Sequence, residues 1–227
     1  MRSRLLSVGV ILASLVAVVS KLHAASIDQR IEQYLMEHPE VVVKALELGS
    51  QKILNARLQD IISYSDSDIV MVNPKGASRL VAYIDYRCDA CKRSFQYIEK
   101  FAKAHPDVAL VLRPLPILGG ESTLASLMAY DAGKLQHAKV LTDELLGLDK
   151  PLDSEALAQV ASHHQLKVTD NPREHWAFKH LAENYRQSSM LNNQSVPLYI
   201  LSVKGQSQMF SGLSSQQILE EAYQRLA

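Results

Sequence analysis

The pattern of the chain between residues 78 and 118 constrains its fold more than any other feature. The stretch SRLVAYIDY is rich in β-branched and aromatic residues, which predicts a strand. Directly after it, CKRSFQYIEKFAKAH has the apolar spacing of a helix, and VALVLRPLPIL predicts a second buried strand. Strand, sharp turn, helix and strand make a βαβ unit, which we expect to be parallel and right-handed. An α/β fold is therefore predicted.

Both cysteines of the chain, Cys88 and Cys91, lie at the turn of this unit. Their C-x-x-C spacing is compatible with a structural disulfide, with half of a metal site or with a reactive pair. A chain of 227 residues can bury a sizeable core without a covalent staple, and so short a disulfide loop contributes little chain entropy. Two thiolates are only half of a tetrahedral zinc site. The reactive pair is therefore favoured, and neither a metal nor a cofactor is expected.

The histidines do not supply the missing half of a metal site. His163 and His164 are adjacent on a predicted helix and project about 100° apart, so we expect them to be poor joint ligands. His175 and His180 also fall on different faces of their predicted helix. A metal site shared between subunits stays open as an alternative.

The start of a helix is a setting that activates a thiol. Cys88 begins the predicted helix, where its sulfur lies near unpaired N–H groups and the positive end of the helix dipole. In such settings the pKa of a cysteine falls from about 8.5 to roughly 3.5–7.5. We expect Cys88 to be the exposed nucleophile and Cys91, one turn later and more buried, to be the resolving thiol. Arg87 would stabilise the thiolate if it points toward the sulfur, and Asp89 would oppose it.

The N-terminal segment has the order of a secretory signal peptide. Arg2 and Arg4 precede an apolar run from Leu5 to Val19, and small residues follow at Ala24 and Ala25. The run is shorter than the roughly 20 residues that span a bilayer as a helix. We expect cleavage after Ala24 or Ala25 and export to the periplasm. An anchor that is kept uncleaved is the alternative.

Residues 26–65 have helical patterns and little else. Ile27, Ile31 and Leu35 recur at i, i+4, and Pro39 suits the first turn of a second helix. That second helix carries an apolar stripe, formed by Val42, Leu46, Ile53, Leu58 and Ile61. Two such helices cannot bury their apolar faces alone, so they pack on the next domain or on copies of themselves. We expect a homo-oligomer.

The rest of the chain is first helical and then a strand pair. Four helices are predicted between Gly119 and Met190. The stretch VPLYILSVKGQSQMFSGL predicts a strand, a turn and a strand, and SSQQILEEAYQRL predicts a last helix capped by Ser214 or Ser215. Basic and acidic residues number 24 each, which is typical of an ordinary soluble surface and indicates no nucleic-acid partner.

In these motifs the chain resembles the DsbA-like thiol:disulfide interchange proteins, and among them the ScsC-type branch with an N-terminal helical segment. The stretches that carry the resemblance are YLMEHPEVVVKAL, NPKG, YIDYRCDAC, RPLPILGGES and VPLYI, which span essentially the whole mature chain. The resemblance implies a thioredoxin-like fold with an inserted helical domain and an N-terminal helical extension. The implied parts are a signal peptide (1–24), an N-terminal helical oligomerisation segment (25–72), the thioredoxin-like domain (73–118 and 192–227) and the inserted helical domain (119–191).

The resemblance also implies a second wall of the site. Pro197 is expected to follow a cis peptide bond and to face the cysteines, and the backbone of Val196 is expected to pair with an incoming client peptide. The chain departs from the family at Asp89 and Ala90, where Pro is common first or Tyr or His second, and at Ser195-Val196, where Gly-Thr is frequent. These positions touch the reactive sulfur, so they are expected to tune the redox balance and the choice of substrate.

The implied activity is disulfide exchange with exported client proteins that carry cysteines, together with a membrane redox partner of the Dsb type. Disulfide isomerase or reductase activity is favoured if the N-terminal helices hold several active sites around one client. A DsbA-type oxidase is the alternative. A chaperone or metal-binding module of a different class would keep its function after Cys88→Ser, whereas an exchange enzyme would lose it.

Overall fold

The computed structural model describes residues 27–63, 65–66, 68–212 and 215–227. The predicted signal segment and its cleavage sites after Ala24 or Ala25 lie outside these residues. The chain divides into two compact units, Met1–Ile53 and Leu54–Ala227. Among the described helices, none combines the length and the apolar character needed to cross a membrane.

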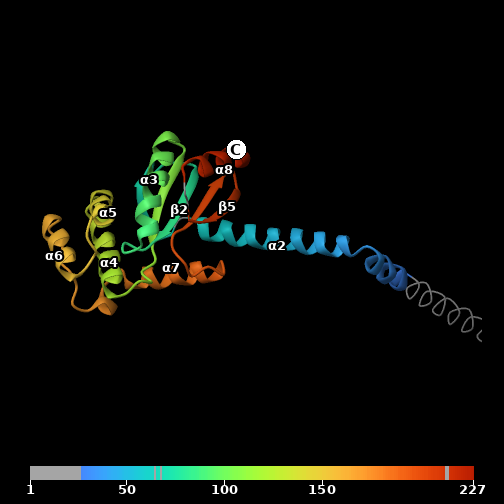
Figure 1. Cartoon of the computed structure of the whole chain (residues 1–227), viewed down its shortest axis with the longest axis horizontal. Helices are drawn as coiled ribbons and strands as arrows, with labels where there is room; N and C mark the ends of the chain where they lie inside the picture. Colours follow the sequence, from blue (N-terminus) through green and yellow to red (C-terminus); the bar gives the residue numbers. More distant parts are fainter. Residues whose placement is uncertain (1–26, 64, 67, 213–214) are drawn as a thin grey trace, which may run out of the picture. The chain divides into compact units, whose positions relative to one another are not determined.

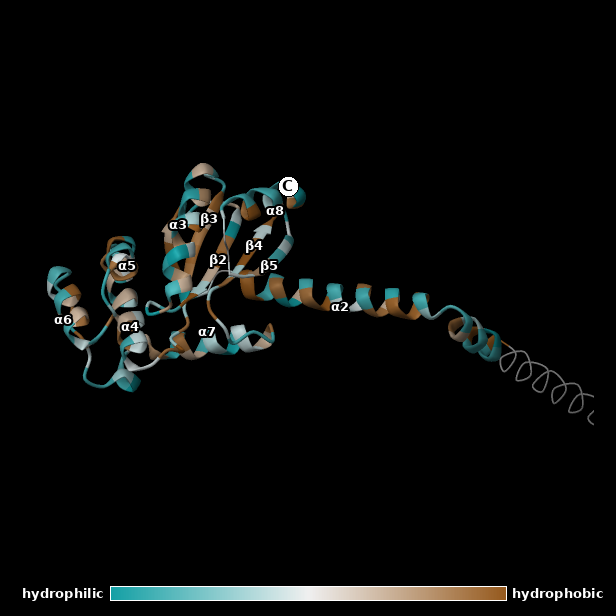
Figure 2. Ribbon diagram, in the orientation of Figure 1, coloured by the Kyte–Doolittle hydropathy of each residue, from teal (hydrophilic) through white to brown (hydrophobic). Residues whose placement is uncertain are grey.

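Helices make up the described part of the first unit. Residues 27–37 are helical, and α2 (Pro39–Ile62) begins at the proline, so the predicted start of a second helix at Pro39 is confirmed. Apolar segments recur along α2 in Figure 2. The large apolar side chains of this unit that are exposed include Ile27, Ile31, Tyr34, Val43, Leu46, Leu48 and Ile53. The unit therefore presents apolar surface that its own described residues do not cover.

A five-stranded sheet forms the centre of the second unit (Figure 1). Its strands are, in spatial order, β1 (Ile69–Val72), β3 (Val108–Pro114), β2 (Ser78–Ile84), β4 (Leu198–Val203) and β5 (Gln206–Ser211). β2 and β3 pair in parallel, and every other neighbouring pair is antiparallel. Because α3 (Asp89–Ala104) connects β2 to β3, the predicted βαβ unit is confirmed.

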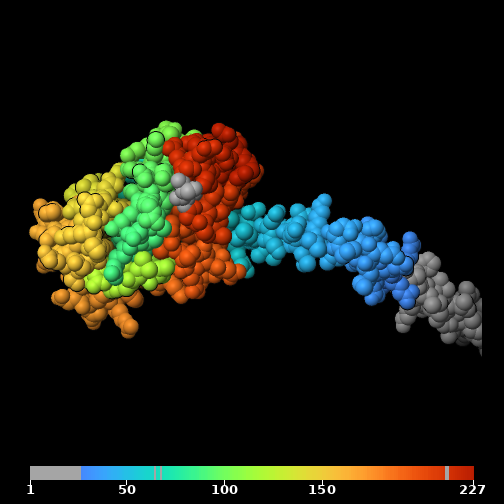
Figure 3. All heavy atoms as spheres, in the orientation of Figure 1, coloured from blue at the N-terminus to red at the C-terminus, as the bar shows by residue number. Residues whose placement is uncertain are grey.

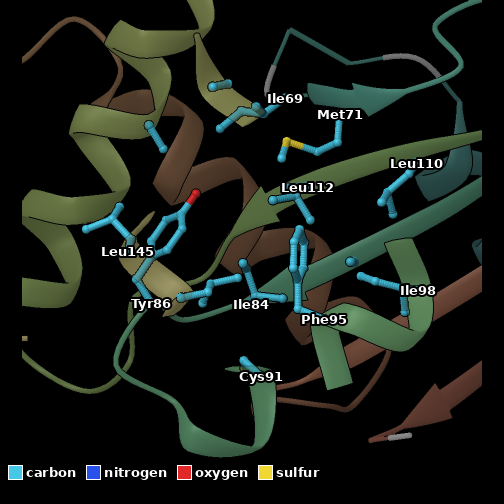
Figure 4. Close-up of a cluster of buried hydrophobic side chains, with 14 of the residues drawn as sticks. Ile69, Met71, Ile84, Tyr86, Cys91, Phe95, Ile98, Leu110, Leu112 and Leu145 are labelled. Carbon is cyan, nitrogen blue, oxygen red and sulfur yellow. The ribbon is translucent and has the colours of Figure 1, made fainter. Parts of the chain in front are cut away.

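Alternate side chains of the central strands build two cores on opposite faces of the sheet. On one face, α3 packs on β3, and Figure 4 shows Phe95 and Ile98 among Leu110 and Leu112. On the other face, the buried residues of the strands pack against the end of α2 and Leu191. β2 and β3 are buried along their whole length, as expected for strands covered on both sides.

The segment between β3 and β4 is helical, as predicted. It contains α4 (Gly120–Lys134), α5 (Ala138–Gly147), α6 (Ser154–His163), a 3₁₀ turn at Pro172–Glu174 and α7 (Phe178–Met190). These helices belong to the same compact unit as the sheet, and in Figure 3 the yellow region of α5 and α6 lies beside the green region of α3. The last helix is α8 (Gln217–Leu226). Its N-cap is Gln216, so the predicted cap at Ser215 is wrong by one residue, and Ser214 lies outside the described residues.

The predicted boundary at residue 72 is also wrong. β1 lies within the predicted N-terminal helical segment, yet it pairs with β3 and places Ile69 opposite Leu112. The end of α2 belongs to the second unit as well, because Leu58, Ile61 and Ile62 are only 1%, 2% and 6% exposed. The compact units instead divide between residues 53 and 54. The apolar periodicity of residues 39–62 predicts a helix. It does not show that only the last turns of this helix pack on the sheet.

A buried ionic cluster joins the end of α2 to the sheet. The Asp68 carboxylate contacts the guanidinium groups of Arg79 and Arg113, and the three side chains are 4%, 6% and 0% exposed. Arg113 also donates hydrogen bonds to the carbonyl of Ile61 at 2.5 Å and to that of Ser63 at 3.1 Å. Carbonyls at the end of a helix lack intrahelical partners, so β3 satisfies two of them through one arginine.

Candidate active site

Cys88 is the N-cap residue of α3, at the turn that follows β2. Its backbone is extended, with φ −82° and ψ 113°, and its sulfur accepts a hydrogen bond from the Cys91 backbone N–H at 3.1 Å. The Cys88 backbone N–H donates to the carbonyl of Asp85 at 3.0 Å. The sulfur therefore takes the place that a Ser or Asp side chain usually occupies at a helix start, facing N–H groups that no turn of the helix uses.

The two thiols have opposite environments. The side-chain hydrogen bond with Cys91 lowers the pKa of the Cys88 thiol to about 7, helped by the backbone N–H groups of Cys91 and Ala90 and opposed by burial and the Asp85 carboxylate. Burial, and then the hydrogen bond with Cys88, raise the pKa of the Cys91 thiol far above its usual range. Cys91 is 0% exposed and lies at the edge of the apolar cluster in Figure 4. Only Cys88 is thus poised to be a thiolate near neutral pH.

The alkylation rate of Cys88 in the reduced protein is expected to titrate with a midpoint near pH 7 rather than near the ordinary cysteine pKa of about 8.5. Because the folded pKa is below the unfolded one, the thiolate stabilises the reduced fold fully above pH 9.0, and this contribution is lost as the pH falls to 7. The difference in unfolding free energy between the reduced protein and Cys88→Ala measures it. A difference that does not change between pH 7 and 9 would contradict this assignment.

Cys88 is less exposed than the sequence predicted. Its exposed fraction is 8%, so the expectation of an openly exposed nucleophile is wrong, although it remains more accessible than Cys91. The reason is that a segment far away in the sequence lies against the sulfur. The Cys88 thiol lies 3.8 Å from the carbonyl oxygen of Val196, more than a hundred residues further along the chain.

Val196 and Pro197 form this wall at the entrance to β4. The peptide bond between them is cis, Val196 is half-buried and Pro197 is buried. β4 pairs antiparallel with β2, with Leu198 opposite Tyr83, which brings the proline loop to the end of β2 where Cys88 follows. The Pro197 carbonyl accepts a hydrogen bond from Gly212 at 3.0 Å. The pairing of β4 with β2 thus holds the Val196 carbonyl beside the Cys88 sulfur.

The guanidinium group of Arg87 does not serve the sulfur. It donates to the Leu118 carbonyl at 2.9 Å and pairs with Glu121 at 3.2 Å, so the condition that it points toward the sulfur is not met. Asp89 and Ala90, between the cysteines, are both exposed. A carboxylate that opposes the Cys88 thiolate is the buried Asp85, which raises the pKa of this thiol.

Asp85 is a site residue that the sequence analysis missed. It is 0% exposed, and its carboxylate accepts hydrogen bonds from the backbone N–H groups of Arg87, Ile117 and Leu118 at 2.8, 2.8 and 2.9 Å. These bonds connect the loop before Cys88 to the loop that follows β3. An acidic residue directly after the run Leu80–Ile84 of a buried strand was the available signal, since a buried carboxylate needs several donors.

The histidines are engaged elsewhere. His163 and His164 bond to the two carboxylate oxygens of Glu144, at 2.8 and 2.9 Å. Both rings reach one carboxylate because α6 ends at His163 and His164 is its C-cap residue. His175 bonds to Asp131 at 3.0 Å. The described residues contain no group of three or more His, Cys, Asp or Glu side chains that could hold a metal ion.

No protein-family model matches the chain, and no curated protein matches it in sequence. Solved structures do match it in fold. Proteus mirabilis ScsC in a transitional conformation has a TM-score of 0.66, is 22% identical and is matched over 90% of this chain and 96% of that one. A periplasmic thioredoxin-like protein from Salmonella enterica serovar Typhimurium has a TM-score of 0.64 at 20% identity, over 74% and 94%. The thiol-disulfide exchange protein alpha-DsbA2 from Wolbachia pipientis has a TM-score of 0.64 at 16% identity, over 79% and 98%. The predicted thioredoxin-like fold is thereby confirmed, and these DsbA-like and ScsC structures share it.

Proposed function

We propose that this chain, which has the thioredoxin-like fold of the DsbA and ScsC type, is a thiol:disulfide oxidoreductase. One observation carries the proposal. The Cys88 sulfur, with a pKa lowered to about 7, lies 3.8 Å from the Val196 carbonyl, and the less acidic Cys91 thiol lies behind it. A thiolate near neutral pH beside a backbone acceptor for an extended peptide is what attack on a client disulfide requires.

The reduction of a client disulfide takes two exchanges. The Cys88 thiolate attacks one client sulfur, which forms a mixed disulfide and releases the other client sulfur as a thiolate. Cys91 then loses its proton and attacks the Cys88 sulfur, which forms the Cys88–Cys91 disulfide and releases the second client thiolate. In isomerisation, another client thiolate attacks the client sulfur of the mixed disulfide instead, which forms a new client disulfide and releases Cys88 as a thiolate. Oxidation of a client is the reduction run in reverse.

The proposal places this chemistry in the periplasm, on exported clients with cysteines, with a membrane redox partner of the Dsb type. The N-terminal order of Arg2, Arg4 and the apolar run supports export. The exposed apolar side chains of residues 27–53 support a homo-oligomer, because association would remove that surface from water. An oligomer that gathers several Cys88 sites around one client favours isomerase or reductase activity. A monomeric oxidase of the DsbA type is the alternative.

The test compares the chain from residue 27 with a chain that begins at Leu54, where the second compact unit begins. Oxidation of a reduced client and repair of a scrambled client are measured for both, with the mass of each in solution. We expect the longer chain to form an oligomer and to repair the scrambled client at least about tenfold faster, because linked sites raise the effective concentration of thiol.

Each other outcome has a definite meaning for the proposal. A monomer from Leu54 that repairs scrambled client as fast as the longer chain contradicts the oligomeric isomerase and leaves the oxidoreductase. Efficient oxidation of reduced client with no repair favours the oxidase. If neither assay shows exchange but the longer chain prevents client aggregation, the chaperone alternative replaces the enzyme.

A further inference from the structure

Two buried hydroxyl groups meet beside the cysteine pair. Ser94 lies in α3 one turn after Ala90, and Tyr199 lies in β4 two residues after Pro197. Ser94 is 1% exposed and Tyr199 is 0% exposed, and their hydroxyl oxygens are hydrogen-bonded to each other. A helix that carries the nucleophile and a strand that carries the opposing wall are thus joined by one polar contact.

The direction of this hydrogen bond follows from the partners of Ser94. The Ser94 hydroxyl has one proton, and the carbonyl oxygens of Ala90 at 2.7 Å and Cys91 at 3.4 Å can only accept. The nearer carbonyl takes the serine proton, so the Tyr199 hydroxyl donates to Ser94. The bonds therefore run from Tyr199 to Ser94 and from Ser94 to the carbonyl of Ala90.

That carbonyl belongs to the peptide group that serves the nucleophile. The Ala90 C=O and the Cys91 N–H form one planar unit, and the Cys91 N–H donates to the Cys88 sulfur at 3.1 Å. A hydrogen bond accepted by a peptide carbonyl polarises the same peptide group and strengthens its N–H as a donor. It also holds the peptide plane in the orientation that points the N–H at the sulfur.

On the basis of the proposed oxidoreductase, we propose that Tyr199 and Ser94 are positioning residues that act on the Cys88 thiolate through the Ala90–Cys91 peptide group. The chain of donors is Tyr199 hydroxyl, Ser94 hydroxyl, Cys91 N–H and then the sulfur. β4 contributes both the Val196 carbonyl, 3.8 Å from the sulfur, and the hydroxyl at the far end of this chain. A client that pairs with the Val196 backbone would therefore engage the strand that also supports the thiolate.

The test is the pH dependence of Cys88 alkylation in the reduced full chain, for Tyr199→Phe, Ser94→Ala and the double variant. Weakening a donor to the thiolate disfavours the charged form, so the pKa rises and the alkylation rate at pH 7 falls by about threefold or more. The double variant is expected to be no slower than the slower single one, because the two hydroxyls act as a unit. Mass spectrometry identifies Cys88 as the alkylated residue.

Tyr83→Phe is the matched control. Tyr83 is also 0% exposed, and its hydroxyl donates to Gln187 on the opposite face of the sheet at 2.8 Å. Its loss is expected to lower stability by a similar amount and to leave the Cys88 profile unchanged. A Tyr83→Phe profile that shifts as far as that of Tyr199→Phe would mean a general loosening of the core and would overturn the proposal.

Tyr199→Phe decides the proposal, because it removes one oxygen and keeps the ring in place. A folded Tyr199→Phe protein with the wild-type profile overturns the proposal, even if Ser94→Ala shifts it. The failure of the parent proposal has a separate signature, since alkylation needs no client. If wild type exchanges no disulfides with any client while Tyr199→Phe still shifts the profile, the oxidoreductase fails and the positioning role stands.

Discussion

Cys88→Ser is expected to abolish client disulfide exchange, with a rate loss of at least about 10³-fold. A serine hydroxyl nearly keeps the size of the side chain and its place at the N-cap of α3, but it has no sulfur with which to form a mixed disulfide. The fold is expected to remain intact, because serine is a preferred N-cap residue. The measurement is the rate of client reduction, with circular dichroism as the control for folding.

Cys91→Ser is the matched variant that separates the roles of the two thiols. It keeps Cys88, the proposed nucleophile, and removes the proposed resolving thiol, so clients are expected to accumulate on Cys88. These adducts are counted on non-reducing gels and assigned by mass spectrometry. Adducts recovered on Cys91 from a Cys88→Ser protein would reverse the assignment. Exchange that survives Cys88→Ser in full would instead favour a function that does not use the cysteine pair.

A chain that begins at Asn73 is expected not to fold, whereas a chain that begins at Leu54 is expected to fold. The shorter chain lacks β1 and the three buried residues at the end of α2, Leu58, Ile61 and Ile62. Each of these side chains contributes roughly 1.5–3 kcal/mol by burial, and a domain is stable by roughly 5–15 kcal/mol in total. Thermal unfolding followed by circular dichroism distinguishes the two chains. A cooperative transition from the Asn73 chain would contradict the reassigned boundary.

Asp68→Asn, made in the chain that begins at Leu54, tests how much the buried ionic cluster between the end of α2 and the sheet stabilises the fold. The carboxylate contacts both Arg79 and Arg113, so its removal leaves two buried guanidinium groups without their shared anion. We expect the free energy of unfolding to fall by about 3–5 kcal/mol, as for other buried pairs that lose one partner. Arg79→Met should cost less, because the Asp68–Arg113 pair and the Arg113 bonds to the Ile61 and Ser63 carbonyls then remain. Chemical denaturation of both variants gives the comparison, and the reverse order would contradict the charge argument.

The local part of the fold was predictable because its signals lie within single elements. The change from a strand pattern to a helical pattern at Cys88, the break at Pro39 and the helical insertion all follow from side-chain periodicity over neighbouring residues. The boundary at residue 72 failed for a complementary reason. The strand Ile69–Val72 has only four residues, too few for a period to distinguish it from a linker.

Charged residues near the cysteines were the least predictable part of the site. Arg87 is adjacent to Cys88 in the sequence, yet its partners are Leu118 and Glu121, more than thirty residues further along the chain. Asp85 was passed over for a related reason, since its donors at Ile117 and Leu118 come from a different loop. A side chain's direction is set by partners that its own sequence neighbourhood does not contain.

The sequence by itself determined that a cysteine begins a helix directly after a strand, and therefore that one thiol of the pair meets unpaired N–H groups. That consequence is local, because the first turn of a helix always leaves its N–H groups free. Only the tertiary structure decided the surroundings of the sulfur: the Val196 carbonyl at 3.8 Å, the Tyr199 and Ser94 hydroxyls, and the buried Asp85. Pairing of β4 with β2 brings Val196 and Tyr199 to Cys88 across more than a hundred residues. The residue pattern within one strand does not show which distant strand it pairs with.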